Sequence, residues 1–138
     1  MIDYDYLKQQ ILRDAETFRI EQFGFDPFNA TQISLQLQAE GMEMAQVRQG
    51  YLTLNEPSKE IERLMLKGKL RHGGHPVLRW CALNVAVETD AADNIKPSKK
   101  KSNERIDGMA ALVSAMAVAM AEGVAKPSVY ASRGLLSM

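Results

Sequence analysis

The run NERIDGMAALVSAMAVAM, residues 103–120, constrains the fold more than any other stretch of the chain. Its apolar side chains recur every three or four positions, which is the spacing of one helix face. The opposite face is scarcely more polar, so we expect neighbouring elements to cover this helix on most sides. The apolar stripe consists of Ile106, Met109, Ala110, Val113, Met116, Ala117 and Met120.

An acid, Asp107, stands where this apolar surface begins. A carboxylate that is buried without a partner costs several kcal/mol or stays protonated, so we expect some group to compensate it. An acid in the first turn of a helix also complements the helix dipole, which is worth under about 1 kcal/mol. Periodicity alone leaves this dipole role and a functional role both open.

Composition indicates one soluble globular domain. The chain has 138 residues, 46% of them apolar and 25% charged, and is long enough to bury a core. A single cysteine, Cys81, excludes an internal disulfide, and the polar N-terminus is unlike a signal peptide, so we expect a cytoplasmic protein. The apolar stretch 109–121 is shorter than the roughly 20 residues that a membrane span needs, so we expect no membrane partner.

Charge is distributed unevenly although the net charge is zero. Residues 1–30 hold six acids against three bases, whereas residues 63–105 hold ten bases against four acids. This asymmetry would suit a polyanion on one side of the molecule. A solvated lysine-rich loop explains the same charges equally well.

The expected order of elements indicates an α/β chain whose neighbouring strands are parallel. Two core strands and one hairpin make a small sheet for so many helices, so the chain resembles the second half of a domain. We expect helices at 4–18, 29–40, 57–67, 76–83 and 103–122, strands at 20–25 and 42–47, and a hairpin of 85–89 and 95–99.

Local signals define several of these ends. Asn29 is a favourable N-cap, Pro57 and Gly68 bracket the third helix, and Pro76 opens the fourth. The sequence from residue 123 to residue 138 shows no periodicity, so we expect a loose tail there after a domain of residues 1–122.

Two acids are candidates for a metal site. Asp26 ends a strand at Asp26-Pro27, and the carboxyl ends of strands are the usual ligand side of an open α/β sheet. Asp107 begins a helix that should pack against that sheet. The two carboxylates could together hold Mg²⁺ or Mn²⁺ for phosphodiester hydrolysis. Taken separately, Asp26 is equally explained as an ordinary Asp-Pro turn, and Asp107 by the helix dipole.

The histidines and the cysteine form a weaker candidate. The spacing of His72, His75 and Cys81 matches no common zinc site. A Cys nucleophile with a His base is possible, but Cys81 lies on an apolar stretch and is better explained as a buried structural thiol. The two histidines, in a glycine loop, could instead contact phosphate.

The run RHGGHPVLRWCALNVAVETDAADNIKPSKKKSNERIDGMAAL, residues 71–112, resembles the carboxyl end of the large terminase subunit of tailed bacteriophages. The similarity extends upstream through IEQFGFDPFNATQISLQLQAEG, VRQGYLTLNEPSKEIERL and the opening IDYDYL. The combination of HGGHPVLRW, the N-x-K-P-S-K element and R-I-D-G is more specific than any single short motif.

This resemblance implies a partial ribonuclease H-like nuclease domain that cuts concatemeric double-stranded viral DNA during packaging. Three acids hold two Mg²⁺ or Mn²⁺ ions in that family, and Asp26 matches the second acid and Asp107 the third. A lysine-bearing arm matches a hairpin that contacts or gates DNA. The DNA-binding candidates are Lys96, Lys99, Lys100 and Lys101, with Arg71 and Arg79 as further phosphate contacts.

The departures from the family pattern also carry information. The first acid, the strands around it and the packaging ATPase have no counterpart in these 138 residues, which contain no Walker-type glycine loop. We therefore expect weak or no nuclease activity from this chain alone. The expected partners are the missing amino-terminal half, the small terminase subunit and the portal. The alternatives are a non-catalytic DNA-binding or assembly module and an inactive prophage remnant.

Overall fold

The computed structural model describes residues 2–28 and 30–125, without the side chains of residues 122–125. Within these ranges helices and short strands follow one another in the predicted order, and the α/β prediction is confirmed. The elements are α1 (Tyr4–Thr17), β1 (Phe23–Phe25), α2 (Thr31–Ala39), β2 (Met44–Gln46), α3 (Tyr51–Leu66), α4 (Pro76–Asn84), β3 (Val87–Thr89), β4 (Ile95–Pro97) and α5 (Asp107–Ala125).

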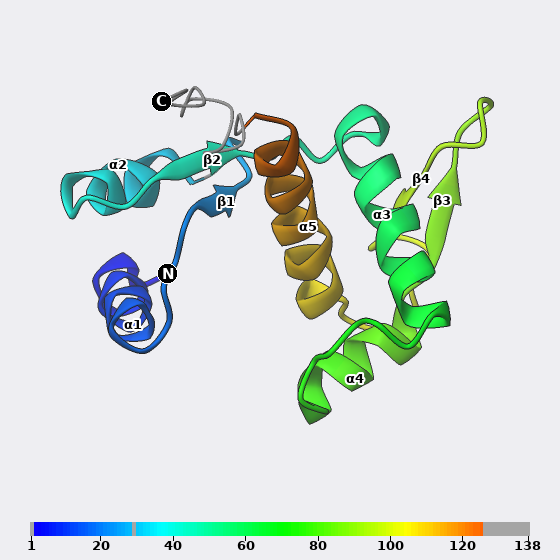
Figure 1. The fold of residues 1–138 in the computed structure, drawn as a ribbon, viewed down its shortest axis with the longest axis horizontal. Coiled ribbons are helices and arrows are strands. Elements are labelled where there is room, and N and C mark those ends of the chain that lie inside the picture. Colours follow the sequence, from blue (N-terminus) through cyan, green and yellow to red (C-terminus); the bar gives the residue numbers. More distant parts are fainter. Residues whose placement is uncertain (1, 29, 126–138) are drawn as a thin grey trace, which may run out of the picture.

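Helix α5 stands in the middle of the molecule (Figure 1). Helices α1 and α2 with the β1–β2 pair lie on one side of it, and α3, α4 and the β3–β4 hairpin lie on the other. Each side has its own buried cluster, so the chain has two cores rather than one. The first comprises Ile11, Ile33 and Leu37, and the second comprises Val47, Leu54, Ile61, Cys81, Met109 and Val113.

The strands pair as predicted but are short. β1 runs parallel to β2, with Gly24 opposite Ala45, and β3 runs antiparallel to β4, with Glu88 opposite Lys96. The strand predicted over 20–25 is reduced to three residues because β2 offers only three partners for it. A two-stranded pair of this length is marginal without helices packed against it.

The prediction that Pro57 opens a helix over 57–67 is wrong, because α3 begins well before it and Pro57 lies buried inside. Gly50 precedes the first turn, and its carbonyl accepts from the Leu54 amide at 3.0 Å. A proline inside a helix costs about 3 kcal/mol. Leu54 and Ile61 bury on the face that packs against α5, which at about 1.5–3 kcal/mol each offsets that cost.

The final helix, predicted over 103–122, begins later, at Asp107. Residues before it close a separate turn, in which the amide and the hydroxyl of Ser102 both donate to the Ser98 carbonyl, at 3.1 and 2.6 Å. Because this turn uses the carbonyl of Ser98 and ends the hairpin, the helix cannot start until the chain has left it.

Two predictions fall partly outside the described residues. The N-cap predicted at Asn29 lies outside them, and α2 begins at Thr31. Of the tail predicted over 123–138, the first three residues are the end of α5, and residues 126–138 lie outside the described ranges. In the part of the chain that the structure describes, no helix is long and apolar enough to cross a membrane.

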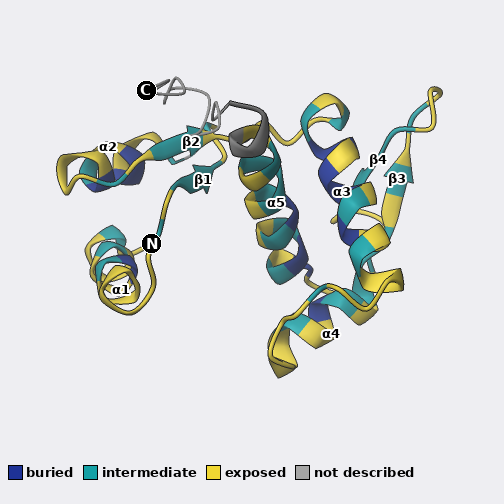
Figure 2. Cartoon of the chain, in the orientation of Figure 1, coloured by how far each residue is buried: buried dark blue, intermediate teal, exposed yellow. Residues whose placement is uncertain are grey.

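The expectation that α5 is covered on most sides is wrong. Figure 2 shows α5 with buried residues toward α3 and exposed residues on the opposite side. Met109 and Val113 are buried, whereas Ala111, Ala115 and Ala119 are exposed. Helices α3 and α4 cover one face and β1 contacts another, which leaves the alanine face open.

Candidate functional site

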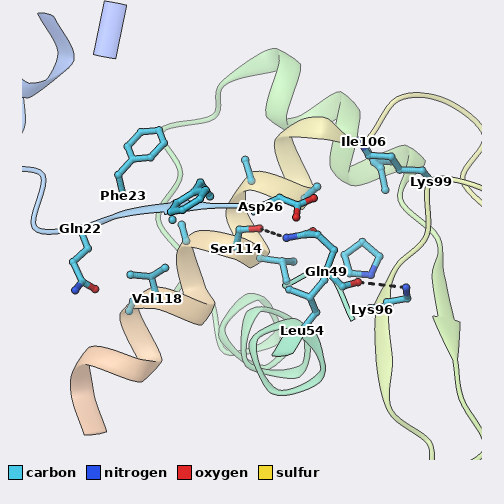
Figure 3. Close-up of a pocket in the computed structure, with 18 of the residues that line it drawn as sticks. Gln22, Phe23, Asp26, Gln49, Leu54, Lys96, Lys99, Ile106, Ser114 and Val118 are labelled. Atoms are coloured by element: carbon cyan, nitrogen blue, oxygen red, sulfur yellow. Dashed lines mark hydrogen bonds between the residues drawn. The ribbon is translucent and has the colours of Figure 1, made fainter. Parts of the chain in front are cut away.

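A cleft of about 1130 Å³ lies between β1, α5 and the chain that leaves the hairpin. Figure 3 shows Asp26, Ser114 and Lys99 among the residues that line it. A smaller hollow of about 450 Å³ contains Asp107 and shares Lys99 and Ile106 with the cleft. The candidate acids therefore lie in two adjoining hollows that have Lys99 in common.

Asp26 follows directly on β1, at the carboxyl end of the strand where it was predicted. Its side chain is exposed, and its Oδ1 accepts from the Phe28 amide at 3.1 Å. This bond closes an Asx turn around Pro27 and orients the carboxylate. The Asp-Pro turn and a ligand role are therefore compatible, since one oxygen serves the turn and the other has no donor among the described residues.

Asp107 is the first residue of α5, and its carboxylate is compensated by a lysine. The Asp107 side chain is 65% exposed, and its Oδ1 lies 3.0 Å from Lys99 Nζ. An exposed pair of this kind contributes about 0–1 kcal/mol. The preceding residue, Ile106, is 1% exposed and anchors the start of the helix. Solvent and Lys99 thus remove the burial problem that the sequence raised.

The two carboxylates fit a hard divalent cation by the chemistry of their oxygens. Mg²⁺ is typically bound through one or two carboxylates together with waters and substrate phosphates. Within the described residues no group of three or more His, Cys, Asp or Glu side chains could hold a metal. Asp26 and Asp107 can thus contribute part of a metal site whose remaining ligands come from substrate or from another segment.

Lys96 is engaged within the protein. Its Nζ lies 3.1 Å from Glu88 Oε1, 3.4 Å from the Gln49 carbonyl oxygen and 5.0 Å from the centre of the Tyr51 ring. The side chain is 24% exposed. Lys96 therefore fastens β4 to α3 through an ion pair and a cation–π contact, and its DNA-binding role stays a prediction.

Glu88 and Tyr51 were not among the predicted site residues, although both surround Lys96. Hydrogen bonds from Ser98 and Lys96 hold the pKa of Glu88 below its usual range, and a bond from Tyr51 adds to this. Burial and the neighbouring Glu88 carboxylate raise the pKa of Tyr51. No spacing in the sequence marks this cluster, because its members come from α3, β3, β4 and the turn after β4.

The lysines that follow β4 project from a closely bonded turn. Ser98 is 3% exposed, its amide donates to the Ala86 carbonyl at 2.8 Å, and its Oγ accepts from the Lys101 amide at 3.2 Å. Ser102 Oγ accepts from the Ala86 amide at 2.9 Å. The turn therefore presents three exposed lysine side chains from an ordered backbone. These are Lys99, Lys100 and Lys101.

The remaining predicted residues lie around α4, outside the lining of the cleft. Arg71 and Arg79 are exposed. His72 Nδ1 accepts from the Gly74 amide at 3.1 Å, and His75 Nδ1 accepts from the Val77 amide at 3.2 Å and caps α4. Cys81 is 3% exposed in the larger core, which confirms the buried structural thiol.

Comparison with known proteins identifies relatives of the whole described region. The family model "Terminase large subunit, endonuclease domain" matches residues 1–123. The terminase large subunit of Enterobacteria phage HK97 is 36% identical over 124 residues, which cover 88% of this chain and 24% of that protein. Protein YmfN of Escherichia coli (strain K12) is 31% identical over 121 residues, which cover 86% and 27%.

The fold agrees with this match. The crystal structure of the HK97 bacteriophage large terminase is similar with a TM-score of 0.78 and 34% identity, covering 85% of this chain and 25% of that chain. The chain spans about a quarter of the length of the curated relatives it matches. The resemblance predicted from the motifs is confirmed, and the chain belongs to the family of terminase large-subunit endonuclease domains.

Proposed function

We propose that this chain forms part of the nuclease of a phage DNA-packaging terminase, which cuts concatemeric double-stranded DNA in the cytoplasm of the bacterial host. The observation that carries the proposal is the placement of Asp26 and Asp107 in adjoining hollows beside a lysine-bearing turn. Family membership supports the same assignment.

Asp26 and Asp107 are the proposed metal ligands. Both carboxylates are exposed and orientable, one by the Phe28 amide and the other by Lys99. A bound Mg²⁺ or Mn²⁺ pair would supply the activated water and the Lewis acidity that phosphodiester hydrolysis needs. The protein's own part is to hold the two carboxylates at the end of β1 and the start of α5.

The DNA phosphates are proposed to lie over the turn after β4. Lys100 and Lys101 are exposed there, and Lys99 stands next to Asp107. Each phosphate neutralised by a lysine contributes to a binding constant that falls steeply with salt. Arg71 and Arg79 are proposed as outer contacts. The rest of the large subunit, the small terminase subunit and the portal are the proposed protein partners.

Metal binding tests the ligand assignment independently of cleavage. In calorimetric titrations with Mn²⁺, Asp26→Asn and Asp107→Asn are each expected to weaken binding by about tenfold or more, because each removes an anionic ligand. Asp93→Asn is the matched control, since Asp93 lies exposed in the hairpin turn at φ 59°, a conformation that Asn tolerates. Equal affinities for all three variants and the unaltered chain would contradict the assignment.

A non-catalytic DNA-binding module is the second candidate, favoured by the ordered lysine turn. Its mark is salt-sensitive binding of duplex DNA that is indifferent to Mn²⁺ and survives both Asp→Asn changes. For the nuclease, we expect weak or no cleavage by the 138 residues alone. Strong Mg²⁺-dependent cleavage by this chain, abolished by Asp26→Ala, would show that no further ligand is needed.

A further inference from the structure

Strand β1 has one paired edge and one open edge. The Phe23 amide donates to the Glu43 carbonyl, and the Val47 amide donates to the Phe25 carbonyl, each at 2.8 Å. Because backbone groups alternate between the two edges of a strand, the groups of Gln22 and Gly24 point away from β2. Within residues 2–28 and 30–125, no residue outside the two strands hydrogen-bonds to the backbone of Gln22 or Gly24.

This open edge faces the cleft. Every residue from Arg19 to Asp26 lines the cleft, whereas β2 contributes none of the lining residues. An unpaired row of amides and carbonyls is a template for a further strand. The cleft thus begins where the sheet stops.

The opposite wall of the cleft is the uncovered face of α5. Ala111, Ala115 and Ala119 are exposed at intervals of one helical turn, with Ser114 and Val118 half-buried beside them. A helix face this apolar is normally covered by a sheet in an α/β protein. An added strand would place alternate side chains on this face, as β1 already does near Val118.

The size of the cleft also favours a polypeptide segment. Its volume of about 1130 Å³ exceeds the range of about 300–1,000 Å³ that small-molecule sites occupy. The relatives are about four times as long as the matched region, so most of the large subunit lies outside it. That remaining part is the occupant to which the family assignment points.

We propose that a β-strand from the part of the terminase large subunit outside the matched region pairs with β1 through Gln22 and Gly24 and covers the alanine face of α5. The proposal relies on the proposed function only for the identity of this partner. Binding by strand addition gains main-chain hydrogen bonds and sequence-tolerant affinity. The added strand would end beside Asp26, where it can complete the site.

The test mixes the 138-residue chain with a separately produced polypeptide, the part of the HK97 large terminase that lies outside its match to this chain. Divalent metal and DNA are left out, so failure of the nuclease assignment leaves the readout intact. We expect a 1:1 complex by calorimetry and at least tenfold slower hydrogen exchange at the Gln22 and Gly24 amides in the complex.

Two matched pairs of variants locate the contact. Gln22→Pro removes an amide on the open edge and is expected to weaken binding about tenfold, whereas Glu21→Pro removes an amide on the other edge and should stay within twofold. Ala115→Glu places a charge in the cleft and should weaken binding tenfold or more. Ala121→Glu changes an exposed alanine of the same helix outside the cleft lining and should not.

Three results would overturn the proposal. The first is no complex with the terminase polypeptide. The second is a dimer of this chain that protects the same amides, since the occupant would then be a second copy. The third is a complex that Gln22→Pro and Ala115→Glu leave unchanged, or that the control variants weaken equally.

Discussion

Glu88 joins more elements than any other charged residue near the cleft. Its carboxylate pairs with Lys96 on β4, accepts from Ser98 in the lysine turn and accepts from Tyr51 on α3. The Asn55 side chain adds a bond from α3 to the Ile95 amide at 2.9 Å. These contacts hold the hairpin, and with it the lysine turn, in one position against α3.

The lowered pKa of Glu88 predicts a pH dependence of this attachment. In the unfolded chain Glu88 takes up its proton near its ordinary pKa of about 4.3, and in the folded chain only at lower pH. Its contribution is therefore complete above about pH 4.3 and declines as the pH falls through the folded pKa. The melting temperature should drop more steeply between pH 5 and pH 3 in the unaltered chain than in Glu88→Gln.

The control for this prediction is Glu104→Gln, which removes an exposed acid from the loop before α5. That variant should keep the steep acid limb of the unaltered chain. Parallel pH profiles for the unaltered chain and Glu88→Gln would contradict the assignment of the acid limb to Glu88.

At the scale of elements, glycines set how closely helices and strands approach. A Cβ on Gly24 would lie 2.8 Å from Val118 Cγ2 and 3.2 Å from Val47 Cγ2, so β1 meets α5 almost backbone to side chain. Gly108 plays the same part between α4 and α5, where a Cβ would lie 3.3 Å from Leu78 Cδ1. The cleft depends on the first of these contacts, because it holds β1 against α5.

Gly24→Ala is expected to destabilise the chain by about 1–3 kcal/mol, the usual cost of overpacking. Urea denaturation measures the change. Gly50→Ala is the control, since no atom lies within 4 Å of its built Cβ. Adding Val118→Ala to Gly24→Ala should recover part of the loss. Equal stabilities of the Gly24→Ala and Gly50→Ala variants would contradict the close approach.

Over the whole molecule, two cores on either side of α5 imply two units of local stability. Leu37 is 0% exposed in the cluster of α1 and α2, and Ile61 is 3% exposed in the cluster of α3, α4 and α5. Apart from the chain itself, the packing of β1 against α5 connects the two sides. Regions linked by few contacts open separately in hydrogen exchange.

Leu37→Ala and Ile61→Ala should therefore affect different amides. Each removes a buried aliphatic side chain at a cost of about 2–5 kcal/mol. Leu37→Ala is expected to reduce hydrogen-exchange protection in α1 and α2 while α3 and α5 keep theirs, and Ile61→Ala should do the reverse. A uniform loss across all helices in both variants would show a single cooperative unit.

The sequence by itself determined the family, the order of elements and the positions of the two acids along the chain. Motifs such as RIDG and HGGHPVLRW are local, and so are the Asp-Pro signal after β1 and the Pro76 signal before α4. Helix and strand periodicities are likewise written in neighbouring residues. The roles of Asp26 and Asp107 as ligands stay predictions.

Only the tertiary structure decided which surfaces meet. Packing against α5 carries α3 through Pro57, and a contact across eight residues gives Asp107 its partner Lys99. Lys96 is enclosed by residues from α3 and β3, which no local pattern announces. The open face of α5 has the same cause: its periodicity shows that the face is apolar, but whether another element covers it depends on contacts distant in the chain.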